Sequence, residues 1–158
     1  MKSYNILFLC TGNSARSILA EALVTTLSGG KFIGYSAGSN PAGRVNPFAS
    51  ELALALGYPK EKLRSKNWDE FSLLDSPQMD FIITVCDNAA NEACPVWVGH
   101  PSTAHWGFPD PASVDGTDAI KREAFQKTLL ALKKNIEALI HLPIDQLDLL
   151  SLKKAIQD

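Results

Sequence analysis

The sequence predicts a doubly wound α/β fold, with a four-stranded parallel sheet and helices on both faces. Short apolar, β-rich runs alternate along the chain with segments of helical periodicity. Because such alternation returns the chain to the same edge of the sheet before each new strand, the strands become parallel. A length of 158 residues and a hydrophobic fraction of 46% suffice for a sizeable core. We therefore expect a single domain over residues 1–158.

The individual elements follow from periodicity and from residues that begin or end helices. Strands are expected over residues 4–9, 31–38, 79–85 and 103–106, and helices over 16–27, 47–56, 67–74, 118–142 and 144–157. Asn46 is a suitable N-cap for the second helix, whose first turn tolerates Pro47. Thr117 begins the long helix and Pro143 stops it.

Composition excludes several classes of function. The net charge of −2 does not favour binding to nucleic acid or to an anionic membrane. The N-terminal apolar run ends at Cys10, which is too short for a signal peptide or a spanning helix. These features predict a soluble, cytoplasmic protein. Three cysteines are an odd number, so we expect them to be reactive, metal-binding or buried rather than a disulfide framework.

The segment from Cys10 to Ser17 joins the first strand to the first helix and is the first candidate site. Gly12 and Asn13 tolerate left-handed backbone, so the turn can direct several N–H groups at one point beside the helix N-terminus. Arg16 adds a planar fork for two oxygens of a tetrahedral oxyanion. In this positive field Cys10 should be a thiolate. The oxyanion-binding residues are expected to be Thr11, Gly12, Asn13, Ser14, Ala15, Arg16 and Ser17.

Two further cysteines follow the third strand, with seven residues between Cys86 and Cys94. Cys86 closes its strand as Cys10 does, so both should lie at the carboxyl edge of the sheet. If the two strands are neighbours, about 4.8 Å apart, a disulfide between these cysteines is geometrically feasible. Zinc binding by Cys86, Cys94, His100 and His105 is the competing interpretation. The wide cysteine spacing argues against it, because zinc sites of this kind usually have about two to four intervening residues.

A third constellation places Asp110 between Pro109 and Pro111, just after the fourth strand. The prolines fix the backbone on both sides of this carboxylate, which should also face the carboxyl edge of the sheet. A rigid surface turn is the alternative interpretation.

The motif with Cys10, Arg16 and Ser17 after an N-terminal strand resembles the phosphate-binding loop of the low-molecular-weight protein tyrosine phosphatases, and the resemblance covers nearly the whole chain. Thiol-coupled arsenate reductases share that fold and loop. Cys86 and Cys94 resemble the additional cysteines of this branch. The phosphatases usually have a second cysteine where this chain has Ala15, and a tyrosine where it has Ala112.

The resemblance implies an arsenate reductase, with arsenate as substrate and phosphate or sulfate as competitors. Cys10 would attack arsenic and Asp110 would protonate the leaving oxygen, while Ser17 lowers the pKa of the Cys10 thiol. Cys86 and Cys94 would then carry a disulfide outward to thioredoxin or to glutaredoxin with glutathione. No cofactor is needed, and a monomer is expected.

Other interpretations remain open. Cys10, Arg16 and Asp110 alone would suffice for a phosphatase, and a non-enzymatic oxyanion or thiol-redox sensor would not need the acid. Some relatives bind potassium near the loop, and the residues of this chain that fall where such ligands would lie are Asn13, Glu21, Ser36 and Asp69.

Overall fold

A parallel sheet forms the centre of the molecule, as the alternating pattern predicts. The structure is a computed structural model that describes residues 3–73, 75–85 and 102–144. Within these ranges the sheet contains β1 (Tyr4–Cys10), β2 (Phe32–Gly38), β3 (Phe81–Thr84) and β4 (Ser102–His105). Their spatial order is β2-β1-β3-β4, and every neighbouring pair is parallel. The first strand is therefore central, and its carboxyl end lies at the edge where the loops gather.

The pairing of β1 fixes what lies on each side of Cys10. On one side the register runs from Tyr4 opposite Phe32 to Cys10 opposite Gly38. On the other side β1 pairs with β3, so that Leu9 lies opposite Thr84. The N–H of Val85 extends this pairing by donating to the Leu9 carbonyl at 2.9 Å.

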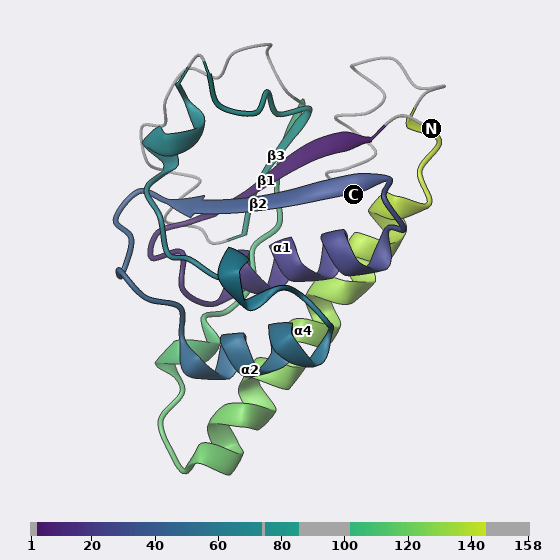
Figure 1. Cartoon of the computed structure of the whole chain (residues 1–158). Helices are drawn as coiled ribbons and strands as arrows, with labels where there is room; N and C mark the ends of the chain where they lie inside the picture. Colours follow the sequence, from purple (N-terminus) through teal and green to yellow (C-terminus); the bar gives the residue numbers. More distant parts are fainter. Residues whose placement is uncertain (1–2, 74, 86–101, 145–158) are drawn as a thin grey trace.

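In the described part of the chain, three α-helices cover one face of the sheet: α1 (Arg16–Leu27), α2 (Pro47–Ala55) and α4 (Asp118–Ile140) (Figure 1). The other face is covered by the 3-10 helix η2 (Trp68–Phe71) (Figure 1). Alternate residues of β1 supply the two layers, because successive side chains of a strand point to opposite faces. Ile6 and Phe8 pack in the α-helical layer, whereas Leu7 and Leu9 pack with Trp68 and Phe71.

Most element boundaries agree with the sequence prediction. The Asn46 side chain accepts a hydrogen bond from the Phe48 N–H at 2.9 Å and so caps α2. Thr117 caps α4 by accepting from the Ile120 N–H at 3.3 Å. Two further 3-10 helices, η1 (Lys60–Lys62) and η3 (Pro111–Ser113), were not predicted.

Several boundaries differ from the prediction. The helix expected over 67–74 is reduced to the four residues of η2. β3 begins at Phe81 rather than 79, because Asp80 is bonded to Asn5 through both its N–H and its carboxylate, each at 2.8 Å. The helix expected over 144–157 lies outside the described residues after Ile144. In the part of the chain that is described, no helix has the length and apolar character needed to cross a membrane.

Candidate active site

The loop between β1 and α1 turns sharply around Asn13, which has a φ of +45°. Asparagine tolerates this left-handed conformation better than most residues do. The loop also passes close to the end of β2, where a Cβ on Gly38 would lie 2.3 Å from the Thr11 carbonyl oxygen. A side chain at position 38 would therefore displace the loop.

Carbonyl oxygens of the loop point outward and accept hydrogen bonds from the surrounding segments. The Thr11 carbonyl accepts from the Asn40 N–H (3.0 Å), the Gly12 carbonyl from the Ala42 N–H (2.9 Å) and the Ser65 hydroxyl (3.0 Å), and the Ser14 carbonyl from the Asn46 N–H (2.8 Å). In a trans peptide the N–H points away from the carbonyl of the same plane. The N–H groups of Gly12, Asn13 and Ala15 are thus directed inward, as an oxyanion cradle requires.

Cys10 lies at the floor of this loop and is 3% exposed. The Ser17 Oγ is 3.0 Å from the Cys10 Sγ, and Asn13 Nδ2 donates to the same Oγ at 2.8 Å. Because the Ser17 oxygen accepts from Asn13, its own proton is available to the sulfur. A hydroxyl donating to sulfur stabilises the thiolate form.

Arg16 and Asp110 meet at the mouth of the loop. Arg16 Nη1 donates to the Phe108 carbonyl at 2.8 Å, and its Nη2 lies 3.9 Å from Asp110 Oδ2. The other Asp110 oxygen accepts from the Ala112 N–H at 2.9 Å, which caps η3. The structure therefore brings Asp110 to the cysteine loop, although the two lie about a hundred residues apart. Its side chain is 44% exposed, so solvent screens this ion pair.

The second cysteine constellation is described only in part. Cys86, Cys94 and His100 lie outside the described residues. The Nδ1 of His105 is 2.7 Å from the Thr84 hydroxyl, so this ring packs between the ends of β3 and β4.

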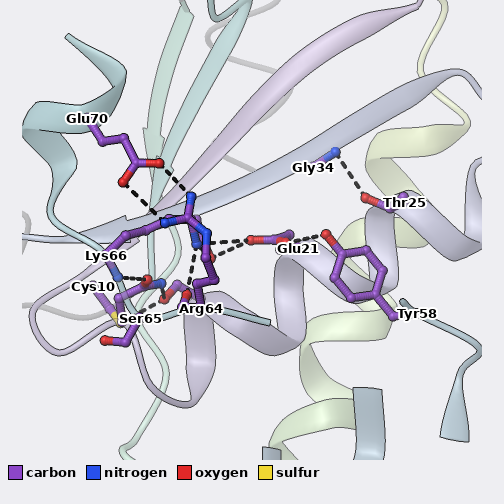
Figure 2. Close-up of polar contacts among 12 residues, drawn as sticks. Cys10, Glu21, Thr25, Gly34, Tyr58, Arg64, Ser65, Lys66 and Glu70 are labelled. Atoms are coloured by element: carbon purple, nitrogen blue, oxygen red, sulfur yellow. Dashed lines mark hydrogen bonds and ion pairs between the residues drawn. The ribbon is translucent and has the colours of Figure 1, made fainter. Parts of the chain in front are cut away.

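A buried polar cluster lies behind the loop, between α1 and β2 (Figure 2). The Lys66 Nζ donates to the Ser36 hydroxyl at 3.3 Å and to the Arg64 carbonyl at 2.9 Å, and lies 3.7 Å from Glu21 Oε1. Glu21 Oε1 accepts from the Ser36 hydroxyl at 2.5 Å, and Oε2 accepts from the Tyr58 hydroxyl. We call Glu21, Ser36, Tyr58 and Lys66 the Lys66 network.

Burial controls the protonation equilibria of this network. Loss of solvation raises the pKa of the Glu21 carboxyl, and the charge of Lys66 opposes that rise. Loss of solvation also lowers the pKa of the Lys66 ammonium, against the attraction of Glu21. Burial and the nearby carboxylate both raise the pKa of Tyr58. Since both Glu21 oxygens accept hydrogen bonds and the Lys66 Nζ donates two, the geometry is that of an ion pair.

The residues proposed for potassium do not fit that ion. The Lys66 ammonium takes the place between the Glu21 carboxylate and the Ser36 hydroxyl. The Asn13 side-chain oxygen accepts from the Lys66 N–H at 2.9 Å, and Asp69 is exposed on η2. A second cation beside the ammonium would meet like-charge repulsion.

The sequence did not predict Lys66 or Tyr58 as residues of the site. One signal was available, because Glu21 stands within the run Leu19-Ala20-Glu21-Ala22-Leu23. An acidic residue among apolar neighbours near a helix start is liable to be buried, and a buried carboxylate needs a cation or several donors. That argument predicts a partner without indicating which of the 15 basic residues it is.

The fold and site define a protein able to hold a tetrahedral oxyanion against a cysteine sulfur. The chain belongs to the low molecular weight phosphotyrosine protein phosphatase family, whose family model matches residues 5–155.

Several proteins similar to this chain are arsenate reductases. The arsenate reductase of Halalkalibacterium halodurans is 36% identical over 132 residues, which cover 84% of this chain and 91% of the relative. That of Bacillus subtilis is 36% identical over 127 residues, covering 80% of this chain and 88% of the relative. The crystal structure of arsenate reductase from Archaeoglobus fulgidus superposes with a TM-score of 0.66 at 27% identity, covering 87% of this chain and 99% of that one.

Proposed function

We propose that the protein is a monomeric, single-domain cytoplasmic arsenate reductase that converts arsenate to arsenite. The relatives that are 36% identical over most of their length carry this name. The loop from Cys10 to Arg16 provides a thiol, inward N–H groups and a guanidinium for a tetrahedral oxyanion. Phosphate and sulfate have the same shape, so they should compete for the loop.

The first step is attack of the Cys10 thiolate on arsenic. A sulfur–arsenic bond forms, and one arsenic–oxygen bond breaks. Asp110 supplies the proton with which that oxygen leaves as water. Arg16 holds two of the remaining oxygens. The 3.9 Å separation between Arg16 and Asp110 supports this assignment, because it places an acid at the mouth of the loop.

The second step is the reduction. Cys86 attacks the Cys10 sulfur, a disulfide forms, and the sulfur–arsenic bond breaks with its electron pair passing to arsenic. Arsenic changes from As(V) to As(III) and leaves as arsenite, while the two sulfurs are oxidised. Cys94 then attacks Cys86, which frees Cys10 and forms a Cys86–Cys94 disulfide.

The pairing of β1 with β3 is the observation that carries this proposal. Val85, the residue before Cys86, donates to the carbonyl of Leu9, the residue before Cys10. The proposed relay requires Cys86, the next residue after Val85, to come within reach of Cys10, and consecutive Cα atoms are only about 3.8 Å apart. A disulfide requires Cα atoms roughly 4.4–6.8 Å apart, which this strand pairing supports.

Reduction of the Cys86–Cys94 disulfide completes the cycle, and either thioredoxin or glutaredoxin with glutathione would supply the electrons. The test is arsenite release from arsenate with each reducing system supplied separately. We expect one system to support many turnovers and the Cys86→Ser variant to support none with either. Equal arsenite release by wild type and Cys86→Ser would contradict the relay.

Phosphoester hydrolysis is a second candidate, favoured by the family to which the chain belongs. It needs only Cys10, Arg16 and Asp110, with water releasing phosphate from Cys10. We therefore expect Cys86→Ser and Cys94→Ser to retain whatever activity the wild type has on an aryl phosphate. If these variants reduced arsenate normally, hydrolysis would become the leading function.

A further inference from the structure

We propose that Lys66 is a positioning residue for Cys10 and that its ammonium serves as a built-in cation behind the oxyanion loop. The Lys66 network then performs internally what a bound monovalent ion would otherwise do. The inference rests on the proposed function only in taking Cys10 as the nucleophile.

The main chain of Lys66 connects directly to the catalytic loop. Its N–H donates to Asn13 Oδ1 at 2.9 Å, although the two residues are 53 positions apart in sequence. Asn13 Nδ2 in turn donates to Ser17, and the Ser17 hydroxyl lies 3.0 Å from the Cys10 sulfur. The orientation of the Asn13 amide therefore depends on where the Lys66 backbone is held.

A second main-chain contact attaches the same residue to the sheet. The Gly38 N–H donates to the Lys66 carbonyl at 2.9 Å, and Gly38 forms an isolated parallel bridge with Asn67. Gly38 lies opposite Cys10 in the register. Lys66 is thus held between the end of β2 and the loop, on the side of the loop away from Asp110.

The side chain of Lys66 fixes this position from within the fold. The Lys66 side chain is 6% exposed, and its ammonium binds oxygens from two different elements, Glu21 of α1 and Ser36 of β2. A third bond returns to the Arg64 carbonyl, two residues before it. Without the ammonium, the Glu21 carboxylate would lose its counter-charge. The segment around Lys66 would also lose its side-chain contacts with Glu21 and Ser36.

The experiment measures the pH dependence of Cys10 alkylation by iodoacetamide, which needs no arsenate. The background is the Cys86→Ser/Cys94→Ser protein, in which Cys10 is the remaining thiol of the three in the sequence. Lys66→Met removes the charge with little loss of length. Lys62→Met is the matched control, because Lys62 is an exposed lysine in η1. Lys66→Ala leaves space for a small cation.

We expect the alkylation midpoint of Lys66→Met to move upward by roughly one pH unit, so that alkylation at a pH below both midpoints slows about tenfold. Lys62→Met should match the background protein. The background protein should also react equally in potassium and choline chloride, whereas Lys66→Ala should react faster in potassium.

Three results would overturn the proposal: equal midpoints for Lys66→Met and Lys62→Met, a potassium requirement in the background protein, or indifference of Lys66→Ala to potassium. If Lys66→Met does not fold, Glu21→Gln/Lys66→Met replaces it, because this pair leaves no unpaired buried charge. The double variant should show the same upward midpoint, and an unchanged midpoint would also overturn the proposal. Failure of arsenate reduction would not alter these alkylation results. The experiment therefore distinguishes a failure of the positioning role of Lys66 from a failure of the proposed arsenate reductase activity.

Discussion

Two cations lie on opposite sides of the same loop, and their surroundings differ. Arg16 at the mouth donates to the Phe108 carbonyl and makes a loose contact of 3.9 Å with an exposed carboxylate. Lys66 at the back is buried against Glu21, Ser36 and the Arg64 carbonyl. A charge that must bind a substrate has to be accessible, whereas a charge that supports the loop can be fully enclosed. Variants at the mouth should therefore change the chemistry directly, whereas variants at the back should change stability and, at Lys66, the pKa of the Cys10 thiol.

The largest expected effect is at the mouth. Cys10→Ser should abolish both arsenate reduction and phosphoester hydrolysis, because a serine hydroxyl is not ionised at neutral pH. Arsenite release and hydrolysis of an aryl phosphate are the two assays. Appreciable turnover in either would remove Cys10 as the nucleophile, provided that urea unfolding shows a normally folded variant.

Asp110→Asn should slow turnover by roughly 10²–10⁴-fold, the range for loss of a general acid. The amide oxygen can still accept from the Ala112 N–H, so the η3 turn and the binding of phosphate should be retained. The measurements are kcat for arsenate and the dissociation constant for phosphate. An unchanged kcat would show that Asp110 has no part in proton transfer.

Lys66→Met should lower the free energy of unfolding by about 3–5 kcal/mol, as expected when one partner of a buried ion pair is removed. Glu21→Gln/Lys66→Met should cost less, since neither charge is then left unpaired. Lys62→Met should change stability by no more than about 0.5 kcal/mol. Urea unfolding gives all three values. A double variant as unstable as Lys66→Met would contradict the ion pair.

The stability difference between wild type and Lys66→Met should grow as pH rises above about 4.5. Burial raises the folded-state pKa of Glu21 above its ordinary value of 4.5, and Lys66 opposes that rise in the wild type. The folded variant therefore binds a proton that the unfolded chain releases, so its stability falls as pH rises through the folded pKa. Urea unfolding at about pH 4.5 and about pH 7.5 tests the sign. A smaller difference at the higher pH would be inconsistent with it.

Tyr58→Phe should have the smallest effect of these changes at the back of the loop. It removes the hydroxyl that donates to Glu21 Oε2, which should cost about 1.5–3 kcal/mol of unfolding free energy. The ring keeps its packing, and kcat should change little because Tyr58 has no bond to the loop among the interactions described. A large fall in kcat at unchanged stability would assign Tyr58 a role in the chemistry.

The sequence predicted the mouth of the loop better than the back, for a physical reason. Cys10, the turn residues and Arg16 are contiguous, so the boundary between strand and helix is enough to place them together. Asp110 was found because proline neighbours mark a rigid position after a strand. The order of the strands required the structure, since tertiary packing determines which strands are neighbours.

Lys66 could not be predicted because its partners are far away in the chain. It stands in the irregular segment Arg64-Ser65-Lys66, which has no periodicity to distinguish a buried lysine from an exposed one. Its contacts with Ser36 and Asn13 span 30 and 53 residues. The potassium interpretation placed Glu21 and Ser36 near each other, and the structure does bring them into contact. It did not predict that the Lys66 side chain binds both of them.

A single-turnover experiment without external reductant tests the central proposal most directly. Reduced protein is mixed with excess arsenate, and both arsenite and remaining thiols are counted. Wild type and Cys94→Ser should each release about one equivalent of arsenite with the loss of two thiols, because the Cys10–Cys86 disulfide forms before Cys94 acts. Cys86→Ser should release none. Arsenite release by Cys86→Ser equal to that of wild type, or none by wild type, would contradict the thiol relay.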